Sequence, residues 1–309
     1  MLSVVIPTYG REQVLVDSIA ALEPQRAALG CSSELLLIDQ TPRHDPAVAE
    51  RLRCWERRGA LRWLRLPQPH LTRAMNTGLL QARGDIVLFL DDDIKPQPGL
   101  LAAHLEAHRR YAMAWAVVGQ VLQPGQRPEP QQPPRRRPGL WRDLDFPFHS
   151  SIGAWVENVI ACNLSLQRQR ALALGGFDER FPPPVAARFE TEFAKRLIAA
   201  GGRIRFAPEA SLHHLAAATG GTRSRGGHLT SASGHHGVGD CYYALRCGRG
   251  LQRSWYLLRR PFREVRTRFH LRHPWWIPVK LLGECRALAQ ALTLSRQSPL
   301  LLPGAEGWR

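Results

Sequence analysis

The sequence lacks several features that would each indicate a particular class of protein. Its six cysteines are scattered, without a C-x-x-C pair or a regular spacing, which fits reduced thiols better than a disulfide scaffold. No stretch reaches the ~18 apolar residues of a membrane-spanning helix, and no internal repeat is present. The first residues enter a strand pattern without a basic segment, unlike a signal peptide. These absences predict a cytoplasmic protein whose membrane contact would be peripheral.

The chain instead has an excess of positive charge. Its 309 residues carry a formal net charge of +16, and the isoelectric point lies near 10.8. The apolar fraction of 44% is ordinary and allows a sizeable core. Such a charge attracts polyanions, anionic lipid headgroups or phosphorylated substrates. Charge alone does not choose among these partners.

Strand and helix patterns alternate over the N-terminal part of the chain. Apolar runs typical of buried strands occupy 3–6, 34–38, 61–66 and 85–90, and helical spacing lies between them at 14–22, 47–58 and 72–82. This order predicts an α/β fold with a mostly parallel, Rossmann-like sheet flanked by helices. Ligands of such sheets bind beyond the carboxyl ends of the strands. We therefore expect the polar residues at those ends to converge on one site: Thr8, Tyr9, Arg11, Asp39 and Asp91 to Asp93.

The remaining sequence predicts three further parts. Residues 123–139, rich in Pro, Gln and Arg, indicate an exposed loop inserted into a domain that spans 1–215, with halves of about 1–120 and 140–215. Residues 216–245 are rich in Gly, Ser, Thr and His and are expected to be flexible. Residues 246–309 combine arginines with aromatic residues and end in an amphipathic helix, which predicts a basic C-terminal extension.

Three consecutive aspartates follow the apolar strand 86–90. Like charges placed together raise one another's pKa unless a cation offsets them. A divalent cation is the simplest such partner, and oxygen ligands suit Mg²⁺ or Mn²⁺. A solvated acidic turn is the alternative, but the position directly after a buried strand favours a metal and diphosphate site.

The order and spacing of several short motifs resemble family 2 glycosyltransferases, which have the GT-A fold. The resemblance runs from about Ser3 to His214. The matching segments are 5–11 (VIPTYGR), Asp39, 73–78 (RAMNTG), 91–93 (DDD), 175–179 (GGFDE), 190–192 (ETE) with Arg196 and Leu197, and His213. Each segment alone is weak evidence, whereas their common order makes chance agreement improbable.

The resemblance implies a role for each matching residue. Pro7, Thr8, Tyr9, Arg11 and Arg73 would bind the nucleotide, and Asp39 would recognise its base. Asp91 would contact the ribose or metal, Asp92 would line the same turn, and Asp93 and His213 would bind the metal. Glu190, found by counting back from Arg196, would be the catalytic base, and Asp178 and Glu192 would contact the acceptor.

Structural alternatives remain open for several of these residues. Glu190 and Glu192 are also what the first turn of a helix favours, and Asp178 could simply cap a turn. His213 and His214 are neighbours, so at most one of them is expected to face the site. Many relatives have paired acids and Gly-Ser where this chain has Asp39 followed by Gln-Thr-Pro, so base recognition could differ.

The resemblance implies an inverting transfer of a sugar from a nucleoside-diphosphate donor, by expectation a UDP-sugar, to a hydroxyl of a glycan or lipid-linked acceptor. A carboxylate that takes the hydroxyl proton is worth about 10²–10⁴ in rate. One alternative is a nucleotidyl- or sugar-phosphate-processing enzyme. Another is an inactive protein that binds polyanions through its basic tail, although the chain has no recognised nucleic-acid module.

Two regions outside the matching segments carry further expectations. Residues 216–239 could be a lid over the donor, with Arg223, Arg225 or His228 near the diphosphate, or a disordered linker. In the C-terminal part, Trp275, Trp276 and the aliphatic stripe of helix 277–294 could lie in an anionic membrane interface. The same stripe could equally pack on the protein.

Overall fold

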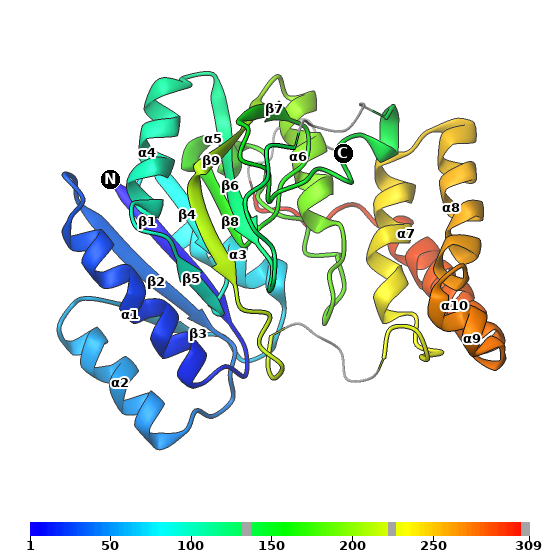
Figure 1. Ribbon diagram of the computed structural model, residues 1–309, viewed down its shortest axis with the longest axis horizontal. Coiled ribbons are helices and arrows are strands. Elements are labelled where there is room, and N and C mark those ends of the chain that lie inside the picture. The colour runs from blue at the N-terminus through cyan, green and yellow to red at the C-terminus, as the bar shows by residue number, and fades with distance from the viewer. Residues whose placement is uncertain (132–136, 222–226, 304–309) are drawn as a thin grey trace.

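The computed structural model describes residues 1–131, 137–221 and 227–303. Within these ranges a nine-stranded sheet has the order β3-β2-β1-β4-β8-β6-β9-β5, and β7 pairs with β9 (Figure 1). The strands are β1 Leu2–Thr8, β2 Ser33–Asp39, β3 Arg62–Arg65, β4 Ile86–Leu90, β5 Ile94–Pro96, β6 Ala114–Leu122, β7 Ala154–Val156, β8 Asn163–Gln167 and β9 Arg203–His214. The α/β fold predicted from the alternating pattern is confirmed.

Strand direction differs between the two halves of the sheet. β3, β2, β1 and β4 are parallel neighbours, as the alternation predicts. β8 then runs antiparallel to both β4 and β6, and β5 and β7 run antiparallel to β9. β6 and β9 are parallel to each other. One sheet contains strands from both predicted halves of residues 1–215, so hydrogen bonds between strands connect the two halves.

Helices cover both faces of the sheet. Helices α1 (Gln13–Ala27), α2 (Pro46–Arg57) and α4 (Leu100–Arg110) contribute to one apolar core, which includes Leu15, Leu52 and Leu101. Helices α3 (Leu71–Gln81), α5 (Arg168–Ala173) and α6 (Phe189–Ala199) contribute to the other, which includes Met75 and Phe193. The hydrophobic effect of these two cores holds the strand ends in fixed positions.

The C-terminal helices form a further layer beside the sheet (Figure 1). They are α7 (His235–Cys247), α8 (Gly250–Val265), α9 (Arg268–Arg272) and α10 (Ile277–Ser295), and two 3₁₀ turns span Gly139–Trp141 and Pro274–Trp276. Tyr242 and Tyr243 of α7 are fully buried and belong to the same apolar core as α6. The expectation that 216–245 is flexible throughout is therefore wrong for 235–245, where Gly, His and Tyr form a packed helix.

Helix α10 packs with a face different from the predicted aliphatic stripe. Its buried residues are Lys280, Gly283, Glu284, Ala287 and Ala291, which recur at helical spacing. Small side chains let α10 approach α7 closely, as shown by Gly237 of α7 beside Ala287. Of the predicted stripe, Cys285 and Leu292 are exposed while Leu288 is partly buried against the core, so the stripe lies at the edge of the packed face rather than at its centre.

Buried ion pairs join the C-terminal helices. Asp240 of α7 accepts hydrogen bonds from Tyr256 (2.7 Å) and Arg260 of α8, and Arg260 donates to Glu284 of α10 at 2.7 Å. Burial opposes the ionisation of Asp240, but Arg260 and its other cationic neighbours lower its pKa to about 2. Within the described ranges, no helix is long and apolar enough to cross a membrane.

Candidate active site

The three aspartates occupy the turn between β4 and β5 at the carboxyl edge of the sheet. Ser18 of α1 holds this turn, because its buried hydroxyl donates to the carbonyl of Asp92 at 3.1 Å and accepts from the amide of Ile94 at 3.1 Å. β5 pairs with the end of β9, where Ile94 lies opposite His214. The turn therefore brings Asp91 and Asp93 to the last residue of a strand far away in sequence.

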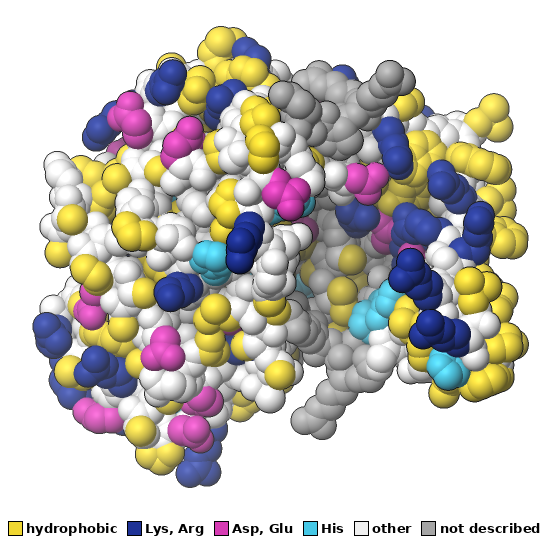
Figure 2. Space-filling view, in the orientation of Figure 1, with side chains coloured by type: hydrophobic (Ala, Val, Ile, Leu, Met, Phe, Trp, Pro, Cys, Tyr) yellow, Lys and Arg dark blue, Asp and Glu magenta, His cyan; other side chains and the backbone are white. Residues whose placement is uncertain are grey.

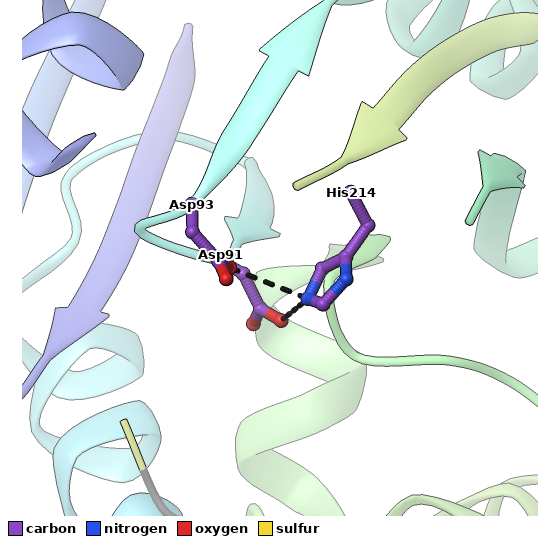
Figure 3. A group of neighbouring side chains, drawn as sticks. All are labelled: Asp91, Asp93 and His214. Carbon is purple, nitrogen blue, oxygen red and sulfur yellow. Dashed lines mark ion pairs between the residues drawn. The ribbon is translucent and has the colours of Figure 1, made fainter. Parts of the chain in front are cut away.

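Asp91, Asp93 and His214 form a compact group of candidate metal ligands (Figure 3). Nε2 of His214 lies 3.4 Å from a carboxylate oxygen of Asp91 and 3.3 Å from one of Asp93. Hydrogen bonds to the two carboxylates raise the pKa of His214 to about 9. One ligand atom from each residue lies within 4.8 Å of the others. Two carboxylates and an imidazole are a donor set that suits Mn²⁺ or Mg²⁺.

The structure places His214, and not His213, in this group. Successive residues of a strand point to opposite sides of the sheet, and β9 continues through both histidines. Only the second one can therefore face the aspartates. Among the described residues, Nδ1 of His214 is buried without a hydrogen-bond partner. The expectation of His213 as the metal ligand is thus corrected: the candidate ligand is His214, in agreement with the expectation that at most one of the pair faces the site.

Arg11 connects the aspartate turn with the loop after β1. Its guanidinium lies 3.3 Å from Asp92 and 3.1 Å from Asp93, and Thr8 donates a 2.6 Å hydrogen bond to Asp92. Burial raises the pKa of Asp92 to about 7, although Thr8 and Arg11 act in the opposite direction. Asp92 and Arg11 are both buried, so their ion pair keeps the aspartate turn in position against the loop after β1.

The segment after β9 closes over the same turn. The amide of Ala217 donates to the carboxylate of Asp93 at 2.8 Å, and Gly221 donates to the carbonyl of Tyr9 at 2.7 Å. Arg11 also donates to the carbonyls of Ala217 (3.1 Å) and Thr219. These hydrogen bonds tie residues 215–221 to the loop after β1 and to the aspartate turn. Arg223 and Arg225 lie outside the described residues, and His228 instead lies 3.1 Å from Glu264 of α8.

Two adjoining cavities open at this edge of the sheet. The first has a volume of about 240 Å³ and is lined by Pro7, Thr8, Tyr9, Arg11, Gln40, Leu71, the three aspartates, His214 and Gly221. The second has a volume of about 280 Å³, and Glu190 lines it together with Phe89, Gln123, Ile160 and Ala187. Pro7, Leu71, Asp91 and His214 line both cavities. Eight of the predicted site residues therefore meet around one connected space: Pro7, Thr8, Tyr9, Arg11, Asp91, Asp92, Asp93 and Glu190.

Glu190 lies in the first turn of helix α6 and lines the second cavity. One carboxylate oxygen accepts a 3.2 Å hydrogen bond from the amide of Ala161, which fixes its direction. The apolar surroundings, which include Phe89, raise the pKa of Glu190 to about 7 despite that hydrogen bond. A carboxyl group with such a pKa is well matched to accepting a proton near neutral pH.

Asp39 lies at the end of β2 but is already fully engaged by protein groups. It is completely buried and accepts hydrogen bonds from His44 (3.0 Å), Trp63 (2.9 Å) and the amide of Thr41 (2.8 Å). Burial opposes its ionisation, yet these donors keep the pKa of Asp39 below its usual value. Gln40, the next residue, is the one that lines the first cavity.

Three further predicted residues have partners elsewhere in the fold. Asp178 is completely buried and accepts hydrogen bonds from Tyr242 (2.8 Å) and the amide of Leu300 (2.8 Å), so it cannot reach an acceptor in this conformation. Glu192 forms a buried double hydrogen bond with Arg196, at 2.7 and 2.9 Å. Arg73 pairs with Glu179 at 3.1 Å. In this structure the three side chains are thus engaged by protein partners and line neither of the two cavities.

Sequence reasoning missed Ser18, Gln40 and the main-chain amide of Ala217. Ser18 lies inside a helix, and nothing local distinguishes it from other helical serines. Gln40 could have been found, because it directly follows a strand whose carboxyl end was expected to face the ligand. The amide of Ala217 has no side-chain signal at all.

Comparison with known proteins assigns the chain to a family. Residues 3–173 match the model of glycosyl transferase family 2, and the chain belongs to that family. The succinoglycan biosynthesis protein ExoM of Rhizobium meliloti (strain 1021) is 31% identical over 157 residues, which are 49% of this chain and 46% of that protein. The chain thus spans about half the length of this curated relative.

Two solved structures share the architecture. GalNAc-T7 with UDP, GalNAc and Mn²⁺ has a TM-score of 0.55 at 16% identity, over 70% of this chain and 44% of that chain. The mannosyltransferase PcManGT from Pyrobaculum calidifontis, in complex with GDP-Man and Mn²⁺, has a TM-score of 0.55 at 19% identity, over 94% and 75%. At these identities the likeness shows the fold, which is GT-A.

Proposed function

We propose that this protein transfers a sugar from a nucleoside-diphosphate donor to a hydroxyl group of a glycan or lipid-linked acceptor, with inversion at the anomeric carbon. The observation that carries the proposal is the shared wall between the two cavities. Asp91 and His214 line both of them, whereas Asp93 lines only the first and Glu190 only the second. A diphosphate in the first cavity would therefore direct its sugar toward the carboxylate in the second.

The ligand group Asp91, Asp93 and His214 would hold Mg²⁺ or Mn²⁺. When bound there, the ion supplies positive charge that offsets the diphosphate of the donor and of the leaving group. Arg11 and Thr8 keep the aspartate turn in position through Asp92. The loop formed by Pro7, Thr8 and Tyr9 provides the other wall of the donor cavity.

Glu190 would act as the general base. Its carboxylate accepts the proton of the acceptor hydroxyl while the hydroxyl oxygen bonds to the anomeric carbon and the bond from that carbon to the diphosphate breaks. One displacement of this kind inverts the anomeric centre. The pKa of Glu190 near 7 keeps about half of the molecules ionised at neutral pH.

Two comparisons support the substrate class without naming the sugar. ExoM is a succinoglycan biosynthesis protein, and a role in polysaccharide biosynthesis fits the match over residues 3–173. The two structural neighbours were solved with a nucleotide or nucleotide-sugar and Mn²⁺. We propose the same ligand class here, and we favour a uridine donor, with guanosine donors as the comparison to make in the experiment.

The proposal is tested by incubating the purified full chain with Mn²⁺ or Mg²⁺ and a panel of UDP- and GDP-sugars. Thermal stability and release of nucleoside diphosphate are followed in parallel. We expect metal-dependent stabilisation by at least one donor and slow donor hydrolysis that an acceptor accelerates. If no donor stabilises the protein and it binds RNA strongly at low salt instead, the polyanion-binding alternative replaces this function. Cleavage to nucleoside monophosphate rather than diphosphate would instead indicate a sugar-phosphate-processing enzyme.

A further inference from the structure

Helix α8 has an apolar face that the described protein leaves uncovered. Leu251, Trp255, Leu258 and Phe262 are exposed to 88, 60, 64 and 67% of their full surface. Their spacing of four, three and four residues puts them on one side of the helix. Contiguous exposed apolar patches on soluble proteins are uncommon and often mark interaction sites. We call these four residues the α8 face.

The opposite side of α8 is firmly packed, so the exposure does not come from a loose helix. Tyr256 and Arg260 are buried, and the ring of Tyr256 contacts that of Trp141 in a tilted arrangement, with 5.3 Å between the ring centroids. Both residues also bond to Asp240 of α7. The α8 face is therefore presented to solvent by a rigid support.

Arginines surround the α8 face. Arg259 on α8 and Arg266, which directly follows the helix, are exposed, and α9 adds exposed Arg268 and Arg272 next to Leu271, which is 80% exposed. Figure 2 shows hydrophobic side chains interspersed with Lys and Arg along the outer side of these helices. The acidic residues of the described chain after Cys247 are Glu264 and Glu284, and both pair with cationic side chains.

We propose that the α8 face docks the protein on the surface of an anionic lipid membrane. Apolar side chains can enter the boundary between headgroups and acyl chains while the flanking guanidinium groups meet lipid phosphates. Trp255 and Trp275, which is 64% exposed, are of the type favoured at this boundary. Helix α8 would lie in the plane of the membrane, because its apolar residues extend along one side of its whole length. Arg259 lies beside this side and Arg266 directly after the end of the helix, where both can meet headgroups.

A second copy of the chain fits the α8 face less well. A symmetric dimer through this face would bring the same arginines of both copies together, because each patch would contact its own equivalent. Like charges facing each other are costly at an interface. A lipid surface offers the opposite charge. The docked helix also differs from the one that the sequence suggests, since α10 uses Lys280, Glu284 and Ala287 for packing.

The inference does not rest on the proposed function, since vesicle binding is measured without a donor. Full-length protein is sedimented with phosphatidylcholine vesicles, with and without phosphatidylglycerol. We expect binding to the anionic vesicles that weakens with added salt. The double variant Trp255→Ser with Phe262→Ser should lower the partition coefficient on the order of 100-fold, because two large side chains lose their apolar burial. The variant Arg259→Gln with Arg266→Gln should weaken binding to anionic vesicles only.

A matched control is Leu80→Ser with Met113→Ser, since these residues are also exposed but lie on α3 and before β6. It should bind vesicles like the unchanged protein. Circular dichroism and thermal unfolding confirm that all variants fold. The proposal is overturned if the unchanged protein stays in solution with anionic vesicles or if the Trp255 and Phe262 variant still binds them fully. A dimer in light scattering that this variant abolishes, without vesicle binding, would assign the face to a second copy instead.

Discussion

The pH dependence of transfer gives a detailed test of Glu190. Its pKa near 7 results mainly from burial, so the carboxylate needed for proton acceptance forms only as the pH rises through that value. About a tenth of the molecules would carry the ionised form at pH 6 and about nine tenths at pH 8. We therefore expect kcat/KM to rise nearly tenfold from pH 6 to a plateau above pH 8. Because kcat/KM reports the free enzyme, its midpoint should follow the pKa of Glu190 before donor binds.

Glu190→Gln removes the proton acceptor while keeping the shape of the side chain. Turnover should fall by about 10²–10⁴ at pH 8, and donor affinity should stay unchanged. The matched control is Glu209→Gln, since Glu209 is an exposed carboxylate on β9 outside both cavities. Initial rates at subsaturating donor, measured from about pH 5.5 to 9, give kcat/KM for the two variants and for the unchanged protein. Wild-type turnover in Glu190→Gln, or the same rising limb in both proteins, would refute the assignment.

Three further predictions follow from other contacts. His214→Ala should weaken metal-dependent donor binding strongly in calorimetry and His213→Ala only slightly; the reverse order would restore the first assignment. Asp240→Ala should cost about 3–5 kcal/mol in urea unfolding, because Arg260 stays buried without its partner. The low pKa of Asp240 means that its contribution is present above the unfolded pKa and is lost as the pH falls toward 2, so the difference in stability between parent and variant should shrink in acid; a difference that stays constant down to about pH 2 would contradict this. Asp178→Asn should lower the melting temperature but leave the KM for acceptor unchanged, and a selective rise in that KM would contradict its structural role.

The sequence predicts the first part of the fold well for a physical reason. Buried parallel strands are continuous apolar runs separated by amphipathic helices, so β1, β2 and β4 and the helices between them are visible in the order of residues. Strand direction after β4 has no such local signal. The antiparallel insertion of β8 between β4 and β6 depends on how residues far apart meet.

The same limit explains which site residues were predicted correctly in position. Asp91 and Asp93 directly follow a buried strand, so their place at the sheet edge follows from local pattern. The choice between His213 and His214 depends on the phase in which β9 enters the sheet. The partners of Asp178 and Glu192 depend on packing against α7 and within α6, and periodicity does not show such pairs.

The charged C-terminal part illustrates how packing can reverse a pattern. The aliphatic stripe leaves open whether that side of α10 packs on the protein or meets a membrane, whereas in the structure small residues and the ion pair between Lys280 and Glu284 (2.8 Å) face α7. Arg260 makes this possible because it compensates both Glu284 and Asp240 in one buried network. A hydrophobic pattern alone cannot reveal that buried charges have partners on other helices.

The most direct test of the account is Mn²⁺ uptake at the aspartate turn, measured by electron paramagnetic resonance during titration with UDP or GDP. We predict that the nucleoside diphosphate strengthens Mn²⁺ binding to the unchanged protein. Asp93→Asn should abolish this uptake, and Glu190→Gln should retain it, since Asp93 belongs to the ligand group and Glu190 lines the neighbouring cavity. Equal uptake by the unchanged protein and Asp93→Asn, or no effect of either nucleotide, would contradict a metal-assisted donor site at this edge of the sheet.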